Sequence, residues 1–86
     1  MIDETEIAQR ASGLPRRFAD RIPSRTREII ELMEDGGEYG ELTIELAASL
    51  AAHHTPVTAA ERDELLALLE AMHMPTDPIA QLNVQG

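Results

Sequence analysis

The chain has 86 residues, no cysteine and a net charge of −9, and only Phe18 and Tyr39 are aromatic. The absence of cysteine excludes a disulfide scaffold and a thiolate metal site, and no apolar run approaches the roughly 18 residues of a transmembrane helix. A core of Leu, Ile, Ala and Met favours packed helices and leaves little room for a deep ligand pocket. The length predicts a single domain. Because the acidic N-terminus does not resemble a secretory signal, we expect a soluble cytoplasmic protein.

The N-terminal part is predicted to contain short helices and a basic segment. Residues 3–12 form the first helix, which Gly13 ends. Leu14-Pro15 then opens one or two helical turns, because proline is well tolerated at a first helical position. Pro23 interrupts this segment. We expect its arginines to pair with acidic helix surfaces of the same fold, since the planar guanidinium group can bind a carboxylate through two hydrogen bonds.

Two longer helices are expected to meet at Gly36-Gly37, where a positive φ angle can end the first of them. Ser24 is predicted to cap this first helix, which runs to about Asp35. Its apolar side carries Ile29, Ile30, Leu32 and Met33. The second helix covers about residues 38–53. Its main apolar stripe is Leu42, Leu46 and Leu50, and a wider apolar surface is formed by Ile44, Ala47, Ala48 and Ala51. This helix is therefore predicted to lie centrally.

A capping box predicts the start of the last helix. The Thr58 hydroxyl accepts from the amide three residues later, while Glu61 reaches back to the Thr58 amide. The helix should cover about residues 59–74 and end at Pro75. Its core face is Leu65, Leu68, Leu69 and Met72. In the tail we expect a short turn at Pro78 and the apolar anchors Ile79, Leu82 and Val84.

No segment shows strand-length alternation, so the chain is predicted to be an all-α bundle of about four helices. The single domain, residues 1–86, would comprise a basic segment (1–23), a three-helix core (24–74) and a tail (75–86). The Ala/Leu surface of the central helix could support self-association, but it fills the core more simply. We therefore do not predict a homo-oligomer.

The motifs of common enzymes and metal sites are missing. A calcium-binding loop starting at Asp35 would place Gly37 and Tyr39 at ligand positions and Leu46 at the position of the bidentate Glu. A glycosidase-type carboxylate pair would need a cleft with sugar-stacking aromatics, and no nucleophile elbow or phosphate loop is present. The histidines lack metal-ligand spacing and are best explained as residues near helix C-termini. They are His53, His54 and His73. We predict no enzymatic activity, no metal and no cofactor.

The charge is concentrated in a strip around the double glycine. Residues 1–27 hold six arginines and four acids, whereas residues 28–86 hold twelve acids and only Arg62 as a cation. The strip comprises Glu28, Glu31, Glu34, Asp35, Glu38, Glu41 and Glu45. Such a surface repels nucleic acid and anionic membranes and attracts basic proteins. From the residues alone two interpretations stay open: a solvated face, or a binding surface on which Tyr39 is an anchor or a core residue.

A resemblance adds a specific hypothesis. The motif Gly37-Glu38-Tyr39-Gly40 is followed by Glu45-Leu46 and Leu50, and then by Pro56-Val57-Thr58 and Glu61. This pattern resembles the small helical immunity proteins of polymorphic toxin systems, in particular the MafI-like family found beside Maf and contact-dependent inhibition toxins. The similarity covers about residues 28–74.

This resemblance implies a non-enzymatic protein that binds the C-terminal domain of a cognate toxin, often a basic nuclease, in a one-to-one complex. Nucleases hold phosphates in positively charged clefts, which carboxylates could occupy. The hypothesised partner-binding residues are Glu34, Asp35, Glu38, Tyr39, Glu41 and Glu45. Two alternatives are a small acidic adaptor that binds another basic protein, and a structural helical module whose charge serves solubility.

Overall fold

Four helices of nine to fourteen residues build the computed structural model, which describes residues 2–85. They are α1 (Glu4–Ser12), α3 (Ser24–Asp35), α4 (Tyr39–Ala52) and α5 (Ala59–Ala71). Shorter elements join them: helix α2 (Leu14–Arg17), the 3-10 helices η1 (Ala19–Arg21) and η2 (Asp77–Gln81), and strands β1 (Pro56–Val57) and β2 (Asn83–Val84). The predicted all-α fold is confirmed. Met1 and Gly86, the two ends of the predicted domain, lie outside the described residues.

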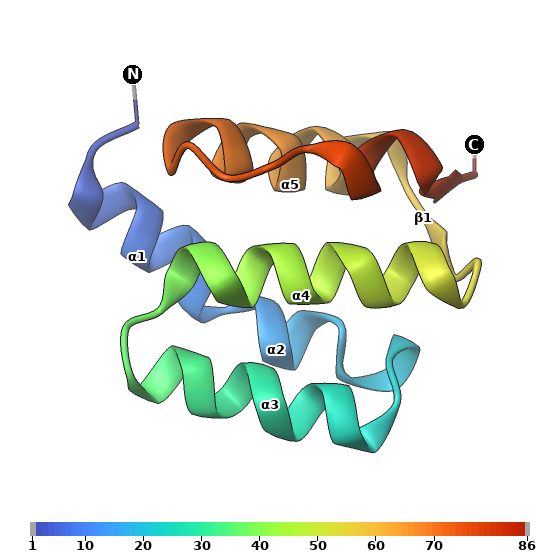
Figure 1. Cartoon of the computed structure of the whole chain (residues 1–86), viewed down its shortest axis with the longest axis horizontal. Helices are drawn as coiled ribbons and strands as arrows, with labels where there is room; N and C mark the ends of the chain where they lie inside the picture. The colour runs from blue at the N-terminus through green and yellow to red at the C-terminus, as the bar shows by residue number, and fades with distance from the viewer. Residues whose placement is uncertain (1, 86) are drawn as a thin grey trace.

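Helix α4 is the centre of the domain, as predicted. Figure 1 shows it between α3 and α5, and it also contacts α1 and η2. The expected stripe of Leu42, Leu46 and Leu50 is fully buried. Ala48 was expected to widen this apolar surface, but it is exposed. The expectation is wrong because Ala48 lies seven residues after Glu41, and two helical turns return it to the same solvent-facing strip.

Helix α3 differs from its prediction at two positions. Ser24 does not cap it: Pro23 is the N-cap residue, its carbonyl accepts from the Arg27 amide at 3.0 Å, and no side chain caps the helix. Leu32 was assigned to the apolar side, but it is 71% exposed. This assignment is wrong because Leu32 lies one turn after Glu28, whereas the buried side of the helix is centred on Ile30.

Three helices end in the same left-handed turn. The residue after each C-cap has a positive φ angle: 70° at Gly37, 51° at His54 and 56° at His73. In each turn the next amide donates to a carbonyl of the last helical turn: Glu38 to Met33 at 2.8 Å, Thr55 to Leu50 at 3.0 Å, and Met74 to Leu69 at 2.9 Å. These are Schellman motifs. The stop predicted at Gly36-Gly37 is confirmed, whereas α5 ends at Ala71, before the predicted stop at Pro75.

The left-handed turns predict opposite stability effects for two substitutions. His73→Gly is expected to raise the free energy of unfolding by about 0.5–1 kcal/mol, because glycine adopts a positive φ angle without steric cost. Gly37→Ala is expected to lower it by about 1 kcal/mol for the reverse reason. Urea unfolding of both variants measures the effect, and His53→Gly is the control because His53 has a φ angle of −96°. Destabilisation by His73→Gly equal to that of His53→Gly would contradict the strain at His73.

Both ends of the chain contribute to the core. Leu14 and Phe18 are buried from the N-terminal side, and the predicted anchors Ile79 and Leu82 are buried from the tail. Strands β1 and β2 pair in parallel, and the Gln85 amide extends this pairing by donating to the carbonyl of Val57 at 2.8 Å. The two strands were not predicted, because two residues are too short to show alternation. The pairing attaches the tail to the loop between α4 and α5.

Ion pairs fasten the basic segment to the bundle, as predicted. Arg16 pairs with Glu34 at 3.3 Å, Arg17 with Glu64 at 2.8 Å, and Arg21 with Glu61 at 2.7 Å. Arg21 binds both carboxylate oxygens of Glu61 and stacks on the buried ring of Phe18, 4.3 Å from the ring centre. The predicted capping box of Thr58 and Glu61 is also confirmed. Glu61 therefore joins the basic segment to the start of α5.

Candidate protein-binding surface

Some carboxylates of the described residues are paired with arginine, and a cluster of exposed ones is not. Five carboxylates pair with arginine: Glu6, Glu34, Glu61, Asp63 and Glu64. A second group, which we call the acidic face, comprises the exposed residues Glu28, Glu31, Asp35, Glu38 and Glu41. Within residues 2–85, none of these five has a cation at ion-pair distance. Their charges are therefore not neutralised by salt bridges of the described structure.

Three residues of the acidic face share one side of α3, and the other two follow at the start of α4. Glu28, Glu31 and Asp35 follow one another at intervals of three and four residues along the outer side of α3. The Schellman turn at Gly37 then places Glu38 as the N-cap of α4, with Glu41 in its first turn. The carbonyl end of α3 carries partial negative charge and strengthens the negative potential beside Asp35. The amide end of α4 carries partial positive charge, so the carboxylate of Glu41 stabilises this helix.

The structure brings three of the six hypothesised contact residues onto the acidic face: Asp35, Glu38 and Glu41. Glu34 does not converge with them, which corrects the expected strip. It points toward α2, where Arg16 pairs with it, and only 16% of its side chain is exposed. The correction follows from the 100° step between adjacent helical residues, which separates Glu34 from Asp35.

The other two hypothesised residues are half-buried. Glu45 lies one turn beyond Glu41 on α4. Tyr39 packs against the core, and its carbonyl accepts the hydroxyl of the buried Thr43 at 2.7 Å. Of the two roles considered for Tyr39, the structure therefore shows the core contact.

An exposed leucine lies within the acidic face. Leu32 is 71% exposed and is the one large hydrophobic residue that is exposed among residues 2–85. Glu31 precedes it directly, Glu28 lies one turn before it and Asp35 one turn after it. Sequence reasoning missed this residue, although its spacing from Glu28 and Asp35 already placed it on the polar side of the helix. The acidic face thus has an apolar side chain among its carboxylates.

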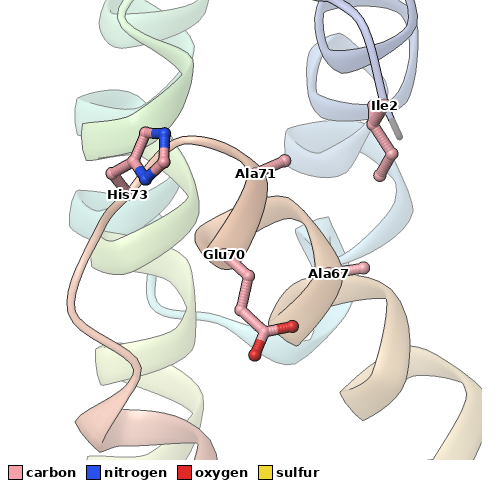
Figure 2. A pocket seen from close by; sticks show the side chains of 5 residues that line it. All are labelled: Ile2, Ala67, Glu70, Ala71 and His73. Carbon is pink, nitrogen blue, oxygen red and sulfur yellow. The ribbon is translucent and has the colours of Figure 1, made fainter.

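A shallow pocket lies elsewhere, between the N-terminal segment and the end of α5. Its volume is about 400 Å³, and it is lined by Ile2, Ala67, Glu70, Ala71 and His73. Figure 2 shows Ile2 facing the methyl groups of Ala67 and Ala71, whereas the carboxylate of Glu70 and the ring of His73 point in different directions. The two ionisable groups do not converge, so this pocket offers no acid–base pair.

Three further findings bear on function. No group of three or more His, Asp or Glu side chains within residues 2–85 is arranged to hold a metal ion. In the same part of the chain, every helix is too short or too polar to cross a bilayer. Comparisons with protein-family models, curated proteins and solved structures found no match to this chain.

Proposed function

We propose that this protein is an immunity protein that binds the C-terminal domain of a basic, nuclease-type toxin through its acidic face. The observation that supports this proposal is the group of five exposed carboxylates without a cation partner in the described structure, in a chain whose other helical surfaces pair several acids with arginine. The resemblance of residues 28–74 to MafI-like immunity proteins supports a toxin as the partner. The complex would contain one copy of each protein.

The chemistry of inhibition follows from charge complementarity. A nuclease binds its substrate with cations that contact phosphates. Carboxylates placed against the same cations would compete with the substrate and accelerate association, because opposite charges steer the encounter of two proteins. The inhibitor needs no catalytic group, cofactor or metal for this role. Its rate of association should fall as salt is added, since salt screens exposed charges.

Co-expression tests the proposal. The partner to use is the C-terminal toxic domain of a long secreted protein encoded by a neighbouring upstream reading frame. We expect this protein to restore growth of cells that produce the toxic domain and to form a stable one-to-one complex with it. Failure to restore growth or to bind would reject the immunity function. A salt-sensitive complex with an unrelated basic protein would favour the adaptor alternative.

A further inference from the structure

We infer that Leu32 is the apolar anchor of the acidic face, and that the partner presents a cationic amphipathic surface: an apolar strip bordered by Arg or Lys side chains. This inference rests on the proposed binding role of the acidic face and specifies the chemistry of the partner. It does not require the partner to be a toxin.

Leu32 contributes little to the stability of the fold. With 71% of its surface exposed, the side chain contributes little to the core, to which α3 contributes Ile30, with Met33 packed against it. Alanine at position 32 would form a helix at least as well. Single exposed leucines are common on protein surfaces, so exposure alone would carry no argument. The carboxylates around this leucine restrict what can cover it.

Covering Leu32 also removes water from the carboxylates beside it, Glu28, Glu31 and Asp35. Removing water from a carboxylate without supplying a cation strongly destabilises the complex. An apolar partner surface without cations would therefore be rejected. A surface with cations but no apolar group would leave Leu32 in contact with water. Both requirements are met only where apolar and cationic side chains lie next to each other.

The same charges exclude other occupants of this face. A second copy of the chain docked through the same face would bring like charges together, which is costly. Nucleic acid and anionic membranes are repelled for the same reason. Arg25 lies two turns before Leu32 on the same side of α3, and it is exposed without an acid at ion-pair distance in the described structure. Arg25 bounds the negative region, so we expect the cations of the partner to lie toward Asp35.

Two synthetic peptides test the inference without a toxin. The first is a 14-residue amphipathic helix of Lys and Leu, and the second has the same lysines with every Leu replaced by Ser. We expect the Lys/Leu peptide to bind the protein about tenfold more tightly than the Lys/Ser peptide. Amide chemical-shift changes on binding should centre on residues 28–35. Calorimetric titration gives the affinities, and NMR of the labelled protein gives the location.

Variants at position 32 provide the decisive comparison. In Leu32→Ala the ratio of the two peptide affinities should fall close to one, whereas Leu32→Met should keep the preference for the Lys/Leu peptide. Glu31→Gln should weaken both peptides by the same factor. Equal affinity for the two peptides, a preference that survives in Leu32→Ala, shift changes centred elsewhere, or no binding of either peptide would overturn the inference. If the preference depends on Leu32 but no toxin is neutralised, only the proposed immunity function fails.

Discussion

The variant E31K/D35K is expected to weaken binding of the toxin domain by several kcal/mol, because it places cations against cations in a desolvated interface. Glu31 and Asp35 are exposed and have no cation partner in the described structure, so their replacement breaks no internal ion pair. Lysine at position 35 even suits the carbonyl end of α3. The variant should therefore unfold at the same temperature as the original protein. Stopped-flow association and calorimetry at low and moderate salt measure the loss.

A control with the same change in net charge separates a local effect from a general one. Glu70 and Asp77 are exposed and lie on α5 and η2, away from α3, with α4 between α3 and α5 (Figure 1). E70K/D77K should slow association only slightly. Variant E38K/E41K should resemble E31K/D35K in binding, with a small loss of stability because Glu41 lies in the first turn of α4. Equal losses in E70K/D77K and E31K/D35K would show that net charge alone determines binding.

The pairing of Arg21 with Glu61 is expected to stabilise the fold by about 1–2 kcal/mol at neutral pH, because solvent screens a partly exposed ion pair, and to lose this contribution in acid. The hydrogen bonds from Arg21 are the main cause that lowers the pKa of Glu61 from 4.5 to about 2. The contribution of a carboxyl group whose pKa is lowered by folding is complete above its unfolded pKa. It should therefore be present above about pH 4.5 and decrease as the pH falls toward 2. Urea unfolding between pH 2 and pH 7 measures this dependence.

The variant E61Q isolates the charge of Glu61 from its role in the helix cap. Glutamine can occupy the same position of a capping box, so E61Q should keep the start of α5 while losing the ion pair. Its stability should depend less on pH below 4.5 than that of the original protein. Removing the other partner, in R21A, should cost about 1–2 kcal/mol and give a similarly flattened pH profile. Parallel pH profiles of E61Q and the original protein would contradict the role assigned to Glu61.

Local signals predicted most of the fold. The capping box at Thr58 and the double glycine at Gly37 were identified because hydrogen bonds within a few residues form these structures. Features that depend on distant partners were missed. The pairing of β1 with β2 joins Val57 to Val84, which are adjacent only after the bundle has formed. The left-handed conformation of His54 and His73 was not predicted either, although both were placed near helix C-termini, because a positive φ angle is uncommon in residues other than glycine.

The candidate surface was predicted only in part, because it too depends on residues that are distant in the sequence. The density of carboxylates near residues 34–45 indicated a charged corner, but the sequence could not show which of them would meet an arginine. Arg16 neutralises Glu34, since α2 packs against α3. Leu32 was assigned to the apolar side of its helix together with Ile29 and Met33, although its spacing from Glu28 and Asp35 placed it outside. The pairing of Glu34 and the exposure of Leu32 both depend on how neighbouring helices pack against α3.

Chemical labelling of carboxyl groups in the free protein and in its complex with the toxin domain tests the proposed interface most directly. A water-soluble carbodiimide with an amine converts accessible Asp and Glu side chains, and mass spectrometry reports each site. We predict that binding protects Glu28, Glu31, Asp35, Glu38 and Glu41, while Glu70 and Asp77 keep their labelling. Unchanged labelling of the acidic face in a stable complex, with protection at Glu70 and Asp77 instead, would contradict the proposed binding surface.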